Sequence, residues 1–592
     1  MTHAAAAGAQ TPREPIRYAL SFPAPQTHYV EVTATVPTGG RADVDLMMAV
    51  WTPGSYLVRE YARNVEAVAA YAPTGRALDV DKSKKNHWRV SAGGVPSITL
   101  KYRVYCREMS VRTNWVEADF ALINGAPTFI TLADMSPRPH EVVITPAAGW
   151  RRSVTALPDM GGGQHRYRAP DYDTLVDSPI VIGNPAVYDF EVDGKKHSLV
   201  NVGEGGVFDG ARAARDLETI VNEDRRLWGF LPYDRYVFFN MITEAGGGLE
   251  HKNSAMLMTN RWSTRTRRAY LSWLELASHE YFHAWNVKRL RPAELGPFDY
   301  ENENITRSLW IAEGFTDYYA ELQVRRAGLS ISEEYLDGLS NAIEALQTTP
   351  GRLVQSAEMA SFDAWIKYYR PDENAANSSI SYYTKGTVIA FLLDAKIRRM
   401  TAGAKSLDDV MRTEYQKFSG PKGYSPEEFR AVAEEVAGGS LKEFWDSAVE
   451  STSELDYMEA LDTLGLRFKS PPAAFADRPA RAWLGIATRN DNGRLLVAQV
   501  QRDSPADVAG INVDDEILAI DDFRVRADRL DNRLDQYRPG DNVSILVARR
   551  EQLLRVPVPL GSEPFRGWRL EVKPGATEGE RQIFDAWQRG IS

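Results

Sequence analysis

The sequence contains a single cysteine, Cys106, among 592 residues. One thiol can form neither an intrachain disulfide framework nor a zinc site built from several cysteines. No run of apolar residues reaches the length of a membrane-spanning helix, and no run of lysine and arginine suggests a nucleic-acid-binding segment. The net charge of -10 also disfavours nucleic acid as a partner. We therefore expect a globular protein of several domains with no nucleic-acid partner and no transmembrane segment.

Histidine is scarce as well, yet two of the nine histidines stand four residues apart in Ser278-His279-Glu280-Tyr281-Phe282-His283. The surrounding segment, 266–286, is predicted to be a helix, on which residues four apart share one face. His279 and His283 can therefore point at a single ion. Two imidazoles, a third protein ligand and one open position suit Zn²⁺. The alternative is a pair of histidines packed in an apolar core.

Glu280 follows the first histidine of this motif by about 100° around the helix. Its carboxylate is therefore expected to lie beside the ion rather than on it. In that position it can take a proton from a water molecule that the ion activates. The motif predicts a zinc-dependent hydrolase in which Glu280 is the general base.

Residues from about 15 to 190 are predicted to form β structure. Three runs, 29–36, 43–50 and 97–105, alternate apolar and polar residues or are rich in β-branched residues. Glycine and proline turns separate them, as is typical of a β-sandwich-like domain. The turn Trp51-Thr52-Pro53-Gly54-Ser55-Tyr56 carries two large aromatic side chains. We expect this turn to serve packing, with contact to a substrate as the alternative.

A glycine-rich segment precedes the zinc motif. After a helix predicted over 208–230 and a buried strand over 236–242 comes Gly246-Gly247-Gly248-Leu249-Glu250-His251. Glycines allow close approach of another backbone, and a strand edge beside a zinc site can bind an extended peptide. A simple hairpin turn is the alternative explanation of the three glycines.

A second helix, predicted over 305–327, carries Glu313 and Asp317 four residues apart on one face. Glu313 is the expected third zinc ligand. Asp317 can accept the second N–H of a ligating histidine and so fix its tautomer. The alternative is a solvated acidic face, which the apolar neighbours Trp310 and Phe315 disfavour.

The remainder of the chain is predicted to contain a helical region, a linker, a strand-rich region and a final helix. Residues 331–465 are predicted to continue as helices, with a polar loop at 368–381 that leads into Tyr382-Tyr383-Thr384-Lys385-Gly386. The composition of Ser470-Pro471-Pro472-Ala473-Ala474 predicts a linker. Strand-like runs follow it, and the charged final residues, 575–592, are predicted to form a loosely packed helix.

The H-E-x-x-H motif, the later Glu313-Gly314-Phe315 and the glycine-rich strand together resemble a gluzincin metallopeptidase. Over about residues 15–465 the layout closely resembles the glycyl aminopeptidases of peptidase family M61. It is more distantly similar to the alanyl aminopeptidases. The resemblance implies a thermolysin-like, mostly helical catalytic domain that holds one Zn²⁺ with His279, His283 and Glu313. His283 and Glu313 are 30 residues apart, a longer spacing than in the alanyl family.

The resemblance also implies roles for residues around the zinc. In the alanyl family a G-[AG]-M-E-N motif holds the substrate's free amine through its glutamate, and Gly247-Gly248-Leu249-Glu250-His251 stands in its place. His251 departs from the alanyl asparagine, although G-G-L-E-H fits the glycyl pattern. Gly247, Gly248, Glu250 and His251 are thus the candidate substrate-binding residues.

A second motif of the alanyl family, Y-E-K-G, carries a tyrosine that stabilises the oxyanion. Tyr383-Thr384-Lys385-Gly386 matches three of its four positions. Tyr383 is therefore the candidate oxyanion donor, with the neighbouring Tyr382 as the alternative.

The stretch of about 478–562 resembles a PDZ domain. Trp483-Leu484-Gly485-Ile486 looks like its carboxylate-binding loop, for which Leu484, Gly485 and Ile486 are the candidate residues. The predicted organisation is multidomain α+β, and its parts are a β-sandwich-like domain over 15–190, a gluzincin catalytic domain over 191–468, a PDZ-like domain over 478–562 and a tail over 563–592.

These observations predict a zinc-dependent aminopeptidase, with one Zn²⁺ per chain, that hydrolyses peptides from the free N-terminus. The resemblance implies a preference for N-terminal Gly or Ala. Two alternatives stay open: a zinc endopeptidase in protein quality control that captures protein C-termini with its PDZ domain, and a non-catalytic peptide-binding scaffold. The expected partners are peptide substrates and a peptide C-terminus at the PDZ domain.

The N-terminus lacks the basic and apolar regions of a signal peptide. The segment Met1–Gln10 is nevertheless rich in small residues, as the remnant of a cleavage region would be. We expect a periplasmic or secreted protein if a signal peptide was removed, and a cytoplasmic protein otherwise.

Overall fold

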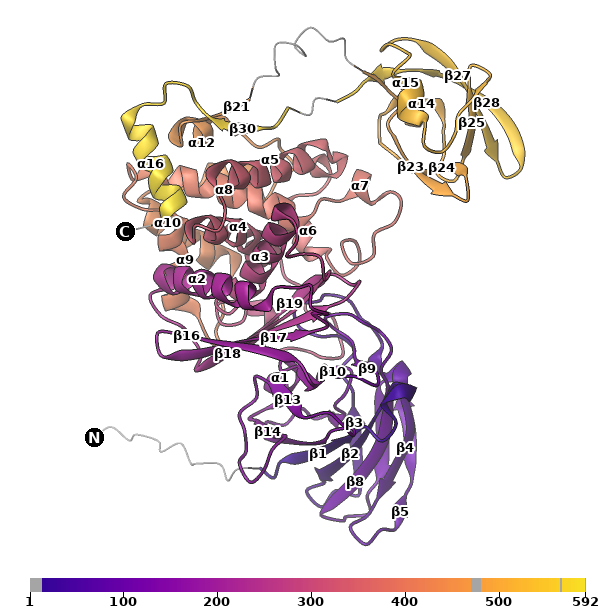
Figure 1. Cartoon of the computed structure of the whole chain (residues 1–592), viewed down its shortest axis with the longest axis vertical. Coiled ribbons are helices and arrows are strands. Elements are labelled where there is room, and N and C mark those ends of the chain that lie inside the picture. Colours follow the sequence, from indigo (N-terminus) through magenta and orange to yellow (C-terminus); the bar gives the residue numbers. More distant parts are fainter. Residues whose placement is uncertain (1–12, 470–480, 565–566, 591–592) are drawn as a thin grey trace. The chain divides into compact units, whose positions relative to one another are not determined.

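The computed structural model describes residues 13–469, 481–564 and 567–590 (Figure 1). The segment Met1–Gln10 and the predicted linker Ser470–Ala474 lie outside the described residues. Contacts between Cα atoms divide the chain into two compact units, one built mainly from residues up to Asn304 and the other mainly from Ile305 onward. This division falls inside the stretch predicted as the catalytic domain.

Residues 16–183 of the first unit form three β-sheets around one apolar core. The strand orders are β14-β12-β1-β2-β8-β4-β5, β13-β15-β10-β9 and β11-β3-β7-β6. Alternation along the strands builds this core, because in β2 the side chains of Val30, Val32 and Ala34 all point inward and are buried. The prediction of a β-rich N-terminal domain is confirmed. Its elements are β1 (Ile16–Ser21), β2 (Tyr29–Pro37), β3 (Asp43–Met47), β4 (Val65–Tyr71), β5 (Ala77–Leu78), β6 (Val80–Lys84), β7 (His87–Ser91), β8 (Ser97–Tyr105), β9 (Trp115–Val116), β10 (Ala121–Ile123), β11 (Thr131–Leu132), β12 (His140–Thr145), β13 (Arg152–Thr155), β14 (Arg166–Ala169), α1 (Tyr172–Val176) and β15 (Ile180–Gly183).

The same unit continues with a five-stranded sheet in the order β16-β17-β18-β20-β19. The three inner strands are parallel, and β16 and β19 pair antiparallel at the two edges. Helices α2 and α3 pack on one face (Figure 1), and on the other face Leu249 and Met256 join a core with Val181 of the N-terminal sheets. A sheet covered on both faces requires strands that are apolar over most of their length, as β18 and β20 are. The elements are β16 (Ala186–Val192), β17 (Lys195–Val202), α2 (Gly210–Trp228), β18 (Arg235–Ile242), β19 (Gly247–His251), β20 (Ser254–Thr259) and α3 (Arg267–Phe282).

Apart from residues 482–562, the second unit is mostly helical and is organised around α8, which packs against α5, α6, α10 and α12. Residues on every side of α8 are buried, as expected for a helix at the centre of a bundle. Its elements are η4 (Trp310–Phe315), α4 (Thr316–Arg326), α5 (Ser332–Thr348), α6 (Ala357–Phe362), α7 (Ala375–Ser378), α8 (Tyr382–Met400), α9 (Leu407–Phe418), α10 (Pro426–Ala437), α11 (Lys442–Phe444), η6 (Trp445–Val449), α12 (Met458–Thr463), β21 (Leu466–Phe468), β30 (Leu570–Val572) and α16 (Glu578–Arg589).

The C-terminal helix α16 differs from the loosely packed helix predicted for this tail. Trp587 is fully buried, and its indole N–H donates a hydrogen bond to the Tyr318 hydroxyl at 2.7 Å. The buried Trp587 therefore fixes the helix. The high charge of the tail had predicted loose packing because it outweighed this single apolar residue.

Residues 482–562 form a small β fold with its own core, which includes Leu484, Val497, Ile520 and Val558. Its main sheet has the order β23-β24-β25-β27-β28, with β26 paired to β25. This fold confirms the predicted C-terminal PDZ region. Its elements are β22 (Ala482–Trp483), β23 (Ile486–Asp491), β24 (Arg494–Val500), α14 (Pro505–Ala509), β25 (Glu516–Ile520), β26 (Phe523–Arg524), α15 (Leu530–Leu534), β27 (Asn542–Arg549), β28 (Gln552–Pro559) and β29 (Gly561–Ser562). Over the described part of the chain, no helix combines the length and apolar character needed to cross a membrane.

Both helices that carry the predicted zinc ligands differ from their predicted bounds. α3 begins after the N-cap Thr266 as expected but ends at Phe282, so that His283 is its C-cap residue. The second helix starts at Trp310 rather than Ile305 and opens with a π-helical turn before it continues as α4. The π-helical turn contains Glu313, and such turns are frequent at functional sites.

Candidate active site

Strand β19 and helix α3 bring the acidic residues of the two predicted motifs together. Ligand atoms of Glu250, Glu280 and His283 all lie within 4.8 Å of one another, and all three residues are buried. A side chain at Gly248 would meet this group, because its Cβ would lie 2.5 Å from Cγ of Glu280. Gly248 therefore lets the Glu280 carboxyl group pack directly on the backbone of β19. The predicted approach of an extended peptide to this strand is a different contact and stays a prediction.

The two histidines of the motif face each other across a short gap. Their Nε2 atoms are 2.9 Å apart, and the Nδ1–H of His283 donates to the backbone carbonyl of Asn286 at 2.7 Å. A carbonyl can only accept, so Nδ1 carries the proton and Nε2 of neutral His283 presents a lone pair. Two imidazole nitrogens at this spacing can both lie about 2.0–2.1 Å from one Zn²⁺. The histidine pair therefore fits a shared metal ion.

Glu313, on the π-helical turn of the second unit, is the carboxylate predicted to complete the donor set. It is almost fully buried. Two histidines and one carboxylate are a donor set of catalytic zinc sites. Among the described residues, this group offers the ligands that the sequence predicted.

A close crossing of two backbones positions Glu313 relative to Tyr383. A Cβ on Gly314 would lie 2.5 Å from Cα of Gly386, and the Thr387 hydroxyl donates to the Gly314 carbonyl at 3.2 Å. Any side chain at either glycine would force the π-helical turn and α8 apart. The glycines of the E-G-F and Y-T-K-G motifs therefore have one shared purpose, which is to let these two segments touch.

The neighbouring phenols differ in accessibility. Tyr382 is fully buried, whereas Tyr383 is half-buried and stacks against Tyr368 with ring centroids 5.4 Å apart. Burial raises the pKa of Tyr383 well above its usual range, and the nearby Glu313 carboxylate adds to the rise. The Tyr383 phenol is therefore neutral and can donate a hydrogen bond. Asp317 lies in the same region, because both Asp317 and Glu313 help burial to raise the pKa of Tyr368.

Glu250 is an unusual carboxylate. It is 4% exposed, and its Oε1 is buried with no hydrogen-bond partner in the part of the chain that the structure describes. A buried carboxylate is costly unless a cation or hydrogen-bond donor compensates it. The site therefore contains one anionic oxygen that a cationic ligand can satisfy.

His251 lies on the other face of the same strand. The regular pairing of β19 with β20 directs Gly248 and Glu250 to one face and Leu249 and His251 to the opposite one. His251 Nδ1 lies 3.2 Å from Asp177. The predicted contact of His251 with substrate stays a prediction, and this geometry favours a role in positioning the strand.

Asp177 was not singled out from the sequence. It also pairs with Lys288 at 2.7 Å and accepts the backbone N–H of Lys252 at the same distance. Burial opposes its ionisation, but Lys288 and His251 outweigh burial and hold the pKa of this carboxyl well below its usual range. Because its partners are up to 111 positions away in the sequence, no local motif could reveal this network.

The candidate carboxylate loop of the PDZ region is ordered by packing within that region. Gly485 has φ +81, and a side chain there would overlap Ser504. The adjoining strand β23 is an edge strand of its sheet as far as the described residues go. An edge strand beside the loop of Leu484, Gly485 and Ile486 leaves backbone groups for a peptide to pair with. This geometry is compatible with capture of a peptide C-terminus, which stays a prediction.

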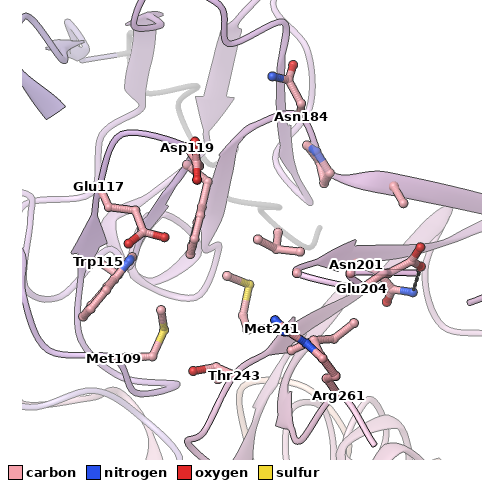
Figure 2. Close-up of a pocket in the computed structure, with 17 residues that line it drawn as sticks. Met109, Trp115, Glu117, Asp119, Asn184, Asn201, Glu204, Met241, Thr243 and Arg261 are labelled. Carbon is pink, nitrogen blue, oxygen red and sulfur yellow. Dashed lines mark hydrogen bonds between the residues drawn. The ribbon is translucent and has the colours of Figure 1, made fainter. Parts of the chain in front are cut away.

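A pocket of about 680 Å³ opens at the carboxyl ends of β17 and β18. Figure 2 shows Glu117 and Asp119 on one side and Glu204, which accepts a hydrogen bond from Asn201, on another. None of the residues that line this pocket is a predicted catalytic, metal-binding or substrate-binding residue. The predicted histidine and carboxylate group therefore lies outside this cavity.

Comparisons with known proteins cover most of the chain. A family model for the peptidase M61 N-terminal domain matches residues 17–184, one for M61 glycyl aminopeptidase matches 272–389, and one for a PDZ domain matches 482–560. The second match spans both histidines, Glu313 and Tyr383 but not Glu250. None of the curated proteins matches the chain at a significant level.

One solved structure matches this chain over almost its whole given length. An aminopeptidase N family protein from Idiomarina loihiensis is 28% identical, with a TM-score of 0.89 over 97% of this chain and 100% of that chain. An M1 zinc metallopeptidase from Deinococcus radiodurans is 14% identical, with a TM-score of 0.46 over 75% of this chain and 95% of that chain. The three family matches and the Idiomarina structure agree with the motifs and the fold. The chain is therefore a peptidase whose sequence matches, in order, the M61 N-terminal domain, M61 glycyl aminopeptidase and a PDZ domain.

Proposed function

We propose that this peptidase is a zinc-dependent aminopeptidase that removes residues from the free N-terminus of peptides, with a preference for N-terminal Gly or Ala. The observation that carries the proposal is Glu250, a buried carboxylate with an unsatisfied oxygen beside Glu280 and His283. The protonated α-amine of a peptide supplies the compensating positive charge and hydrogen-bond donors. A blocked N-terminus supplies no charge and would leave the carboxylate uncompensated. The preference for a small first residue comes from the family resemblance.

In this mechanism His279, His283 and Glu313 hold one Zn²⁺, which when bound polarises the scissile carbonyl and lowers the pKa of a water molecule. Glu280 takes the proton from the water that attacks the carbonyl carbon. The Tyr383 hydroxyl donates to the oxygen that becomes negative in the tetrahedral intermediate. Glu280 then gives its proton to the leaving amine nitrogen as the C–N bond breaks. Glu250 holds the α-ammonium group throughout and so sets which bond is cleaved.

Glu250→Gln is expected to raise KM for a peptide with a free N-terminus by about 10- to 100-fold, because a charge-assisted hydrogen bond contributes about 1.5–3 kcal/mol. Its kcat should change less, since the amide leaves Glu280 and the zinc ligands in place. Steady-state kinetics on matched free and N-acetylated peptides measure both quantities. Glu244→Gln is the matched control, because Glu244 is exposed on the loop before β19.

Two outcomes would contradict the aminopeptidase assignment. One is equal cleavage of the free and the N-acetylated peptide by the wild type, which would favour the PDZ-assisted endopeptidase. The other is an unchanged KM in Glu250→Gln. If no chelator-sensitive hydrolysis occurs with either peptide, the non-catalytic scaffold is the remaining explanation.

Tyr383→Phe is expected to lower kcat by about 10²- to 10³-fold, as the loss of an oxyanion donor does elsewhere. KM should stay nearly constant, because the donor acts mainly on the charge that develops during the reaction. Tyr382→Phe serves as the comparison, because it removes the same hydroxyl group from the adjacent, fully buried tyrosine. If the loss of kcat follows Tyr382 instead, the assignment of the two phenols must be exchanged.

A further inference from the structure

A loop of the N-terminal β domain reaches the predicted amine-binding carboxylate. Gly54, in the turn Trp51–Tyr56, packs so closely on Glu250 that a Cβ at position 54 would overlap both carboxylate oxygens, with Oε1 the nearest, and would lie 2.5 Å from Oε2 and 2.6 Å from the carboxyl carbon. Real Cβ atoms do not approach other atoms this closely, so one of the two groups would have to move. The turn is therefore part of the wall around Glu250 as well as a packing element.

The turn is anchored on its first side by Trp51. The Trp51 side chain is fully buried, and its indole N–H donates to the carbonyl of Asp299 at 2.7 Å. Its ring packs against Phe298 and Tyr300 with centroids 5.9 and 6.3 Å apart. The backbone N–H of Val50 also donates to the Tyr300 carbonyl at 2.9 Å. This side of the turn is therefore fixed to the segment that follows the zinc-binding helix.

The other side of the turn is held by Arg59. Its guanidinium donates to the carbonyl oxygens of Ser55 and Leu57 at 3.3 and 3.0 Å, and its backbone N–H donates to Val50 at 2.8 Å. Gly54 lies between these two anchors with φ +88, a conformation that costs other residues about 1–2 kcal/mol. Because the turn cannot move back easily, a new side chain at position 54 would displace the Glu250 carboxylate.

We propose that Gly54 is a positioning residue for Glu250, and that the N-terminal β domain thereby sets the selectivity of the enzyme for free N-termini. This inference rests on the proposed aminopeptidase function. The bare backbone of Gly54 packs against both oxygens of the Glu250 carboxylate, and Oε1 has no hydrogen-bond partner among the described residues, so its lone pairs are available to the substrate's ammonium group. Substrate recognition is in this way shared between β19 and a loop almost 200 positions earlier in the chain.

The test is Gly54→Ala, read against Gly149→Ala. Gly149 has the same φ of +88 but nothing within 4 Å of its Cβ position, so it reproduces the backbone strain without the overlap. Gly54→Ala should raise KM for a peptide with a free N-terminus at least 10-fold, with kcat and zinc content within about twofold of wild type. Gly149→Ala should leave all three quantities near wild type. Equal effects of the two substitutions on KM would overturn the inference.

A second variant separates overlap at Glu250 from a general defect. Glu250→Asp shortens the side chain by one methylene and withdraws the carboxylate from position 54. The KM penalty of Gly54→Ala should therefore fall from at least 10-fold to less than about threefold when it is measured in the Glu250→Asp background. If Gly54→Ala alone does not fold, recovery of a folded protein in that background supports the inference, and failure to recover overturns it.

Cleavage of free and N-acetylated peptides by the wild type separates failure of this inference from failure of the proposed function. A wild type that cleaves free and N-acetylated peptides equally refutes the aminopeptidase assignment and the inference with it. A wild type that prefers the free N-terminus, combined with an unchanged KM in Gly54→Ala, refutes the role of Gly54 alone.

Discussion

Glu280→Gln is expected to lower kcat by about 10²- to 10⁴-fold while the protein keeps one zinc ion per chain. Glutamine has the same shape as glutamate but cannot accept the proton of the attacking water. Glu280 is buried beside His283 and against Gly248, so the amide should occupy the same place without disturbing the zinc ligands. Turnover of a peptide with a free N-terminus, together with elemental analysis for zinc, checks both parts of the expectation.

The matched control is Glu275→Gln, which makes the same chemical change on the same helix at a residue five positions away. It should retain turnover within about twofold of wild type. Hydrolysis at the wild-type rate by Glu280→Gln would show that another group is the base. Loss of zinc together with activity would instead make Glu280 a ligand, contrary to its predicted position beside the ion.

Glu313→Ala is expected to weaken zinc binding more than 100-fold and to abolish turnover at ordinary zinc concentrations. Loss of a residue that merely supports a ligand costs about 10–100-fold in metal affinity, and Glu313 is assigned as a ligand itself. Only two imidazoles would remain, fewer than the three protein ligands of catalytic zinc sites. Competition with a chelator measures the affinity directly, independently of activity.

Two further variants provide a comparison for the loss of zinc affinity in Glu313→Ala. Asp317→Asn should weaken zinc binding by about 10–100-fold, less than Glu313→Ala, if Asp317 supports a ligating histidine. Glu321→Ala, one turn beyond Asp317 on α4, should leave zinc affinity unchanged. A Glu313→Ala variant that binds zinc as tightly as the wild type would remove Glu313 from the ligand set.

The parts of the site that were predictable from sequence are those set by short-range spacing. His279 and His283 are four residues apart on one helix, so their common face follows from helix geometry alone. Glu313 was predicted as the third ligand from its place with Asp317 on the next helix, but 30 residues separate it from His283, so spacing alone does not fix where it lies. The β-rich N-terminal domain followed from strand alternation, and the PDZ region from its own motifs.

The parts that were missed depend on backbone atoms and on contacts distant in sequence. The carbonyl of Asn286 fixes the tautomer of His283, and a backbone acceptor leaves no signature in the identity of its residue. Gly54 contacts Glu250 across 196 positions, and its turn was expected to serve packing because aromatic residues flank it. The π-helical turn around Glu313 was also missed, since the apolar spacing that predicts a helix does not distinguish one turn geometry from another.

The crossing of Gly314 and Gly386 has a mechanical consequence. Because backbone touches backbone there, no flexible side chain lies between the turn that carries Glu313 and the helix that begins with Tyr382 and Tyr383. A displacement of either segment therefore displaces the other directly. Under the roles proposed for Glu313 and Tyr383, retention of the metal and stabilisation of the transition state are therefore coupled, and a substitution at either glycine would alter both at once.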